Sequence, residues 1–524
     1  MDIYSWQKLT AEEKLCSHSL RGGLRVIAKI RTVPTFIRTV PILLINTLHI
    51  IFVLVNLLAW TVSNCYSYSD AIVVYNRIEN SPVMRLWDDL GKTWQEENLG
   101  LAITGSENIP RVVKVYSAPA NGPRPNEKIV IALNNDGRLV AMVWDGSSFP
   151  SSKIVTLTTN LSGQVSYIPF DGAYELTNST FIVVYSGGGT GDGSQCLWAS
   201  WDGTNWTTNR TFPAEPGSVA YRWVRVEAQP KVGSNRIVAV VAEALDAGEL
   251  YAIWWNGSSW GSWTNLTNGT ILPNAVEGGN SGRAWDVAFA SSTGRCYVFL
   301  AENDVIDRCY SDDGGAWTAV TNNTVTLDVG GGTFRWCFAA ADRSAGSNRI
   351  IVATLDSAND IAFAALINDT WGSQAGGHQV PDTSLETSAQ SNTLPVLGVA
   401  FESDSGDGLL VYAESGLNAP RYRVWTPSGG LGQEQTMPTN LGGLTINSLQ
   451  LFGDRNTNDI WFAGENNRGR LMFVRWNGTS WGTASLVTPR ISMNAQRACY
   501  GMSQGAIAYG RNDHQVPYRT LGVH

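Results

Sequence analysis

The chain has 524 residues, of which 16% are charged, and it carries a formal net charge of −8 at pH 7. Its 53 glycines and 21 tryptophans suit short strands joined by tight turns, and so few charges argue against a coiled coil or a disordered chain. The negative balance offers no basic field for a phosphate backbone, so nucleic acid is not an expected partner.

The N-terminus combines a basic tail with an apolar segment. Residues 1–40 hold seven Lys or Arg against three Asp or Glu, and residues 41–60 (PILLINTLHIIFVLVNLLAW) hold none of these four types. Twenty helical residues span about 30 Å, the thickness of a hydrocarbon core. We therefore predict a hydrophobic α-helix over 41–63 that anchors the chain in the cell membrane in a single pass. The tail would lie on the cytoplasmic side and residues 64–524 on the extracytoplasmic side.

Two other uses of the apolar segment remain open. A cleaved signal peptide would need a shorter basic region than forty residues. A filament-core helix, as in pilins, would normally follow a short basic leader at once, whereas Gly22 and Gly23 precede the charged stretch Leu-Arg-Val-Ile-Ala-Lys.

From residue 71 onward the chain repeats. A tryptophan, a polar turn and a second aromatic or apolar residue recur at steps of 51 to 59 residues. The clearest copies are WDGSSF from Trp144, WDGTNW from Trp201, WNGSSW from Trp255 and WNGTSW from Trp476, and looser copies begin at Trp87, Tyr310, Leu366 and Trp425. Asp-Gly and Asn-Gly supply the positive φ angles of a tight hairpin turn. A period of this length, carried by β-forming residues, predicts a repeat architecture.

Each repeat contains four predicted strands. One copy runs RWVRVEAQP, RIVAVVAEA, ELYAIWWNGSSW and SWTNLT, with turn residues between the strands. The fold is therefore predicted to be all-β: a β-propeller of four-stranded antiparallel blades over 64–524.

Seven repeats are complete, and the two termini supply partial ones. AIVVYNRIE and PVMRLWDD are predicted as second and third strands. RACYGMS, GAIAYGRND and QVPYRTLG are predicted as first, second and third strands. Strands shared between the termini would close the ring without exposed sheet edges. We predict eight blades, with seven as the alternative.

At the WNGSSW and WDGTNW turns the chain resembles bacterial and fungal propeller lectins. It is also similar, more loosely, to the BNR/Asp-box repeats of sialidases. Residues 311–317 (SDDGGAW) are one residue short of the Asp-box pattern Ser-x-Asp-x-Gly-x-x-Trp, and the other copies keep only the Asp/Asn-Gly and the Trp. The resemblance covers about 72–522 and concerns a structural turn, so it bears on fold more than on function.

The favoured function is a surface binding or adhesion module for glycans or surface proteins. Aromatic rings beside carboxylates can stack on sugars and bind their hydroxyls, and the candidate ligand residues are Trp144, Trp201, Trp255, Trp476, Asp145 and Asp202. The competing interpretation is that these tryptophans only pack between blades. An alternative of a different class is a structural protein. Copies of the chain would assemble into a surface filament or layer, with the apolar helix in the core of that homo-oligomer.

An enzyme is less favoured. His378 and His514 both lie in His-Gln-Val-Pro strings that suit recurrent loops, and no nucleophile or metalloprotease motif is present. A sialidase-like glycoside hydrolase would need converging arginines, for which the candidates are Arg222, Arg225, Arg283, Arg335, Arg421 and Arg423. No catalytic residue is assigned and no cofactor is expected. The single Asp/Gly loop at 404–408 (DSGDG) loosely resembles a calcium loop.

Two kinds of covalent modification are considered for an extracytoplasmic domain. Cys296 and Cys309 fall on predicted hairpin partners and could form a disulfide, or could simply be small buried residues. Ten Asn-x-Ser/Thr sequons could carry glycans: Asn160, Asn178, Asn205, Asn209, Asn256, Asn265, Asn268, Asn322, Asn368 and Asn477.

Overall fold

A computed structural model describes residues 110–486, apart from short loops, and the segments 71–75, 83–88, 93–94, 98–99 and 505–509. The chain divides into two compact units, Met1–Ser67 and Tyr68–His524, and every described residue belongs to the second. The predicted tail at 1–40 and helix at 41–63 lie outside the described residues. Within the described part, no helix is long and apolar enough to cross a membrane.

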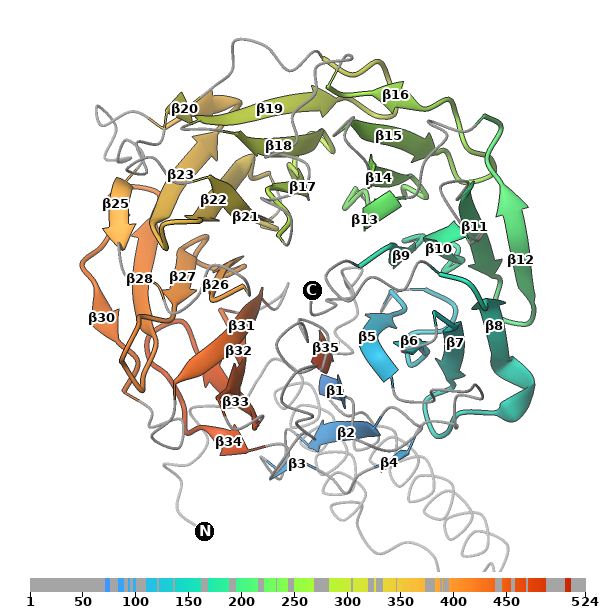
Figure 1. The fold of residues 1–524 in the computed structure, drawn as a ribbon, viewed down its shortest axis with the longest axis horizontal. Helices are drawn as coiled ribbons and strands as arrows, with labels where there is room; N and C mark the ends of the chain where they lie inside the picture. The colour runs from blue at the N-terminus through green and yellow to red at the C-terminus, as the bar shows by residue number, and fades with distance from the viewer. Residues whose placement is uncertain are drawn as a thin grey trace, which may run out of the picture. The chain divides into compact units, whose positions relative to one another are not determined.

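The described strands form eight antiparallel sheets that follow one another around a common centre (Figure 1). In each sheet the first strand lies innermost, and the later strands step outward. An array of four-stranded meanders of this kind is a β-propeller. The predicted all-β meander is confirmed, and the described residues contain no α-helix, only a short 3-10 helix η2 (Ser151–Lys153).

We number the sheets along the chain. Sheet 1 consists of β5 (Pro110–Ser117), β6 (Lys128–Asn134), β7 (Leu139–Trp144) and β8 (Ile154–Thr158). Sheet 2 consists of β9 (Phe170–Tyr174), β10 (Phe181–Gly187), β11 (Gln195–Trp201) and β12 (Trp206–Thr211). Sheet 3 consists of β13 (Tyr221–Ala228), β14 (Ile237–Glu243), β15 (Leu250–Trp255) and β16 (Thr264–Asn265). Sheet 4 consists of β17 (Trp285–Phe289), β18 (Cys296–Glu302), β19 (Val305–Ser311) and β20 (Val325–Thr326).

The next three sheets repeat the order, and in two of them the outer strand is split. Sheet 5 consists of β21 (Phe334–Ala341), β22 (Arg349–Asp356), β23 (Ile361–Ile367), β24 (Thr370–Trp371) and β25 (Asp382–Glu386). Sheet 6 consists of β26 (Leu397–Phe401), β27 (Gly408–Tyr412), β28 (Arg421–Thr426), β29 (Gly430–Leu431) and β30 (Gln435–Thr436). Sheet 7 consists of β31 (Ile446–Gly453), β32 (Ile460–Asn466), β33 (Leu471–Trp476) and β34 (Ser485–Leu486).

Sheet 8 joins the two ends of the repeat region. It consists of β35 (Gly505–Tyr509), β1 (Ala71–Tyr75), β2 (Val83–Asp88), β3 (Thr93–Trp94) and β4 (Asn98–Leu99), with β35 paired to β1. The predicted composite sheet is thus present, but GAIAY is its innermost strand rather than a second strand. The prediction erred because GAIAY and AIVVY are both short apolar β-forming runs, and alternation alone does not distinguish adjacent strands. The other two C-terminal strands that were predicted, RACYGMS and QVPYRTLG, lie outside the described residues.

The tight turns follow from local chemistry. In the WNGSSW copy, Gly257 has φ +99°, and the Asn256 side chain accepts hydrogen bonds from the backbone N–H groups of Ser258 and Ser259, both at 2.9 Å. This Asx-type turn reverses the chain after β15. Trp255 and Trp260 then face each other across the hairpin, as an isolated bridge and a T-shaped ring pair 5.5 Å apart.

The structural repeat is two sheets long rather than one. The first strands of the odd sheets begin at Pro110, Tyr221, Phe334 and Ile446, 111 to 113 residues apart, and each carries a register shift near its start. The first strands of the even sheets carry no such shift.

Three of the two-sheet units are joined by a backbone hydrogen bond at the inner edge. The N–H groups of Val224, Cys337 and Leu449 donate to the carbonyls of Ile168, Arg283 and Pro395, at 3.2, 2.9 and 2.9 Å. These bonds join sheets 2 and 3, 4 and 5, and 6 and 7. The close approach requires a glycine at position 282, because a Cβ there would lie 1.9 Å from the Arg335 carbonyl oxygen.

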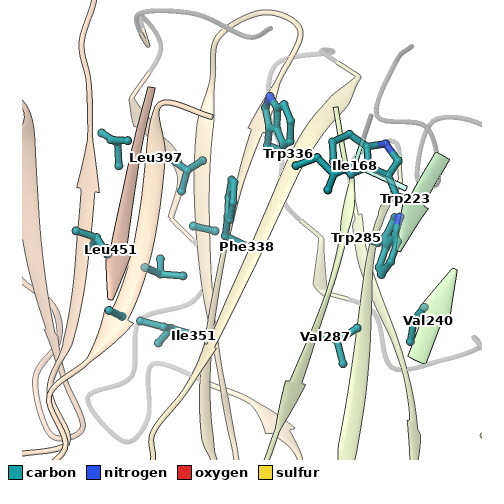
Figure 2. Close-up of a cluster of buried hydrophobic side chains, with 14 of the residues drawn as sticks. Ile168, Trp223, Val240, Trp285, Val287, Trp336, Phe338, Ile351, Leu397 and Leu451 are labelled. Carbon is teal, nitrogen blue, oxygen red and sulfur yellow. The ribbon is translucent and has the colours of Figure 1, made fainter. Parts of the chain in front are cut away.

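Apolar side chains fill the space between neighbouring sheets. Trp223, Trp285 and Trp336 are almost fully buried, and Figure 2 shows them above Val240 and Val287. Two residues along β21 from Trp336, Phe338 stacks on the Trp336 ring and lies toward Leu397 and Leu451 in the same view. The core is therefore built between sheets, which is why no single repeat could bury its own apolar face.

The repeated tryptophans also tether the two sheets of a unit. Trp255 Nε1 donates to buried Glu175 at 2.6 Å, and Trp476 Nε1 donates to buried Glu402 at 2.6 Å. In sheets 4 and 5 neither partner is present: Leu366 of sheet 5 occupies the position of the tryptophan, and Ala290 of sheet 4 occupies that of the glutamate. Donor and acceptor are lost together, so no buried carboxylate is left without its indole.

We predict that Trp255→Phe lowers the free energy of unfolding by about 2 kcal/mol or more, because it removes both packing and the indole donor to buried Glu175. The matched control is Trp201→Phe: Trp201 is equally buried, but its Nε1 has no hydrogen-bond partner among the described residues. Denaturant melts of the two variants measure the difference. Equal losses would show that the Trp255–Glu175 bond adds no stability.

Candidate functional site: the central cavity

A chain of alternating charges lies on the innermost strands of sheets 1 to 4. Lys114 of β5, Asp171 of β9, Arg225 of β13 and Asp286 of β17 follow one another around the centre, and Arg283 precedes β17. All but Arg225, whose side chain is 14% exposed, are nearly completely buried. We call these five residues the ionic arc. Burying charges at such density requires that each one be paired.

Asp171 joins three sheets. Its Oδ1 accepts from Lys114 Nζ and from the Tyr116 hydroxyl, both at 2.9 Å. Its Oδ2 accepts from the Val226 backbone N–H at 3.0 Å and from Arg225 Nη1 at 3.4 Å. Burial alone would raise the pKa of Asp171, but the charges of Lys114 and Arg225 outweigh it and hold that pKa below its ordinary value.

Asp286 repeats this arrangement one unit further on. Its Oδ1 accepts from Arg225 Nε and Arg283 Nη2, both at 3.1 Å, and its Oδ2 accepts from the Ala339 backbone N–H at 3.0 Å. Arg225 also contacts Glu227 at 3.1 Å. In both cases a carboxylate of an even sheet accepts a hydrogen bond from a backbone N–H of the following odd sheet. Arg225 contacts both carboxylates and so links Asp171 to Asp286.

The ionic arc ends at sheet 5. The shared register shows which residues replace the charges. In sheet 5, Phe338 occupies the position that Arg225 has in sheet 3, and in sheet 7 Gln450 occupies it. In sheet 6, Gly398 occupies the position of Asp171 and Asp286. A Cβ at Gly398 would lie 3.1 Å from the Leu451 backbone nitrogen, the counterpart of the Val226 and Ala339 nitrogens. The chain thus lacks a carboxylate at the place where the two preceding units have one.

A cavity of about 130 Å³ occupies this place. Its charged wall is formed by Arg225, Glu227, Arg283, Asp286 and Arg343. Its apolar wall comes from β21, β26 and β31 and includes Phe338, Phe401 and Phe452. A concave site with an apolar floor and a few convergent polar groups is the usual form of a small-ligand site.

The cations of the arc respond differently to burial. Burial lowers the pKa of Lys114 to about 8, against the opposing effect of Asp171. Burial, aided by the positive charge of Arg225, lowers the pKa of Arg283 to about 10 despite Asp286. For Arg225, burial is outweighed by Asp286, Glu227 and Asp171, so its pKa is raised. Arg283 is accordingly the guanidinium of the arc for which burial outweighs the paired carboxylate.

Four of the predicted ligand residues lie away from this cavity and are buried. Trp144, Trp201, Trp255 and Trp476 are 1% to 7% exposed and pack against neighbouring side chains, so they present no open ring face. Asp145 and Asp202 are exposed, and each caps its own hairpin turn by accepting backbone N–H groups. A ligand role for the two aspartates stays a prediction.

Of the six candidate arginines, the structure brings together Arg225 and Arg283, through their shared partner Asp286. Arg421 and Arg423 lie on β28, the third strand of sheet 6, where Arg421 pairs with Glu414 at 2.9 Å. Sequence reasoning missed Lys114, Asp171 and Asp286. The available signal was a charge inside an otherwise apolar inner strand, as in RVVKVY, FDGAY and WDVAF.

The disulfide considered between Cys296 and Cys309 is absent from the structure. Cys296 pairs with Ser311 and Cys309 with Val298, so the two cysteines are offset by two residues across the hairpin. Cys309 is a free thiol buried in the core. The offset puts both on one face as small buried residues, the other interpretation the sequence allowed.

The remaining predicted sites are on the surface or outside the description. Among the described residues no cluster of three or more His, Cys, Asp or Glu could hold a metal ion. In the loop at 404–408, Asp404 and Ser405 donate their backbone N–H groups to the side-chain oxygen of Asn458. His378 and His514 lie outside the described residues, as do the sequons Asn268 and Asn322. Asn265 is half-buried, and the exposed sequon asparagines are Asn160, Asn178, Asn205, Asn209, Asn256, Asn368 and Asn477.

No protein-family model matches the chain, and no curated protein matches it in sequence. Solved structures share the general arrangement at a distance. The BP39L lectin from Burkholderia pseudomallei is 13% identical, with a TM-score of 0.47 over 72% of this chain and 100% of that one. A mutant of AofleA from Arthrobotrys oligospora is 11% identical, with a TM-score of 0.36 over 76% and 93% of the two chains. A fucose-specific lectin from Aleuria aurantia is 14% identical, with a TM-score of 0.34 over 62% and 95%.

We predict that Asp171→Asn lowers the free energy of unfolding by about 3 kcal/mol or more, because it leaves Lys114 and Arg225 buried without their shared anion. The control is Asp145→Asn in an exposed turn, which should cost less than about 1 kcal/mol. Denaturant melts measure both changes. Equal small losses would show that the ionic arc does not stabilise the fold.

Proposed function

We propose that this protein is a non-enzymatic binding module that takes the end of a glycan into the central cavity of an eight-bladed propeller. The observation that carries the proposal is the cavity's composition. Arginine and carboxylate groups on one wall can donate to and accept from sugar hydroxyls, and the apolar residues on the other can contact the apolar face of a sugar ring.

The eight sheets are, on this proposal, the eight blades of one closed ring. The shared sheet 8 supports closure, because β35 near the C-terminus pairs with β1 near the start of the repeats. Closure matters for binding because the cavity walls come from five different sheets, 3 to 7. Fixing those sheets relative to one another preorganises the site.

The setting that we propose is the outer face of a cell membrane, with residues 41–63 as the anchor and 1–40 on the cytoplasmic side. The uncharged length of 41–60 and its basic flank support this. Glycans or glycosylated surface proteins would then be the accessible partners. The same apolar segment could instead lie in the core of a surface filament, in which case the propeller would be displayed on its outside.

A hydrolytic role is less well supported by the geometry. A glycoside hydrolase uses two carboxyl groups flanking the scissile bond, one of them as an acid. The cavity contains Glu227 and Asp286, and Arg225 forms ion pairs with both of them, at 3.1 Å each. Groups engaged in this way suit hydrogen-bond acceptance and orientation of a ligand.

The test is glycan-array binding by the full-length protein in detergent. We expect at least one glycan class to bind, and Gly398→Val to weaken that binding by roughly tenfold or more, because the added side chain fills the cavity. Gly261→Val adds the same side chain at an exposed position, where a Cβ would meet only an ordinary contact at 3.6 Å, and this control should bind as the wild type does. Absence of binding across neutral and acidic glycans would refute the proposal, and unchanged binding by Gly398→Val would refute the location.

A further inference from the structure

Arg283 is unusual among the charged residues of the cavity. Its side chain is 2% exposed, and its Nη2 contacts Asp286 at 3.1 Å and the Cys337 carbonyl at 3.4 Å. Its Nε and Nη1 are buried and have no hydrogen-bond partner among the described residues. A guanidinium has five donors, and leaving charged donors unsatisfied in the interior is costly.

The surroundings of Arg283 favour an anion. Its guanidinium lies 5.8 Å from the Trp285 ring centre and 5.7 Å from that of Phe338, and Phe338 stands where the previous odd sheet has Arg225. The walls of the cavity carry three guanidinium groups and two carboxylates.

The repeat itself indicates which anion fits. In sheets 2 and 4 the corresponding position holds the carboxylates of Asp171 and Asp286, each bonded to a cation and to a backbone N–H of the next sheet. In sheet 6 that position is Gly398, and the cavity lies beside it. Sheet 6 lacks the carboxylate, and Phe338 and Gln450 replace the cation at the Arg225 position on either side. A ligand carboxylate would therefore depend on the guanidinium groups that line the cavity.

We propose that the central cavity binds a ligand carboxylate, with Arg283 as its main partner, and that the ligand class is an acidic sugar such as a uronate at the end of a glycan. This inference rests on the proposed cavity and narrows its ligand. A dianion such as a phosphate monoester suits the site less well, because Glu227 and Asp286 share the same wall and would repel the second charge. A volume of about 130 Å³ admits the carboxylate and part of its ring, with the rest of the glycan outside.

The test uses the full-length protein and two probes, D-glucuronate and D-galacturonate. Each is compared by titration calorimetry with its neutral amide, which has the same shape. We expect the carboxylate of at least one pair to bind about ten- to a hundredfold more tightly than its amide, as charge-assisted bonds to a guanidinium predict. Arg283→Met should abolish this preference.

A second variant guards against loss of folding in Arg283→Met. Gly398→Asp supplies an internal carboxylate at the position of Asp171 and Asp286, and we expect it to prevent uronate binding. Because its Cβ would lie 3.1 Å from the Leu451 nitrogen, a thermal melt checks that the variant folds. Arg421→Met, on the outer part of sheet 6, is the matched control and should leave the preference unchanged.

The outcomes separate the two proposals. Binding of neutral glycans on the array, with no preference for either uronate over its amide, would overturn the carboxylate inference and leave the glycan-binding module standing. Uronate preference that survives both Arg283→Met and Gly398→Asp would overturn the assignment to this cavity. Uronate binding with no array binding would support the carboxylate site and refute the glycan partner.

Discussion

The structure depends on how polar groups are satisfied where the innermost strands converge. Strands that meet edge to edge around a centre bring backbone N–H groups and side chains into a space with little water, and each buried donor needs an acceptor. Asp171 and Asp286 meet this need by accepting the N–H groups of Val226 and Ala339 in the neighbouring sheet. Their own charge is then balanced by Lys114, Arg225 and Arg283.

The same constraint produces the asymmetry of the centre. Along sheets 1 to 4 the space is filled with ion pairs, whereas a cavity remains beside Phe338 of sheet 5 and Gly398 of sheet 6. Arg283 lies at the border, bonded on one side to Asp286 and unsatisfied on the other. The repeat thus degenerates on one side of the centre, while ion pairs link the inner strands of sheets 1 to 4 on the other.

Parts of this could be predicted from residues alone. The Trp–turn–aromatic string places the hairpins correctly, because Asn256 and Gly257 encode the turn locally. Alternating apolar runs give the strands. The two-sheet period was also present in the sequence, since FDGAY, WDVAF, LGVAF and GAIAY share a form that the odd inner strands lack. The one-sheet spacing of the tryptophans concealed it, and GAIAY was misplaced for that reason.

The role of the repeated tryptophans cannot be read from their neighbours along the chain. Their sequence context suits a sugar platform and a packing residue equally well, and only the partner decides: Trp255 is buried against Glu175, eighty positions away in the chain. By itself the sequence determined the all-β class, the repeat and the turns, because these follow from neighbours along the chain. The tertiary structure alone decided which sheets form a unit, which charges meet and where a cavity remains. Those outcomes depend on contacts between residues 50 to 80 positions apart, and one chain's spacing does not record them.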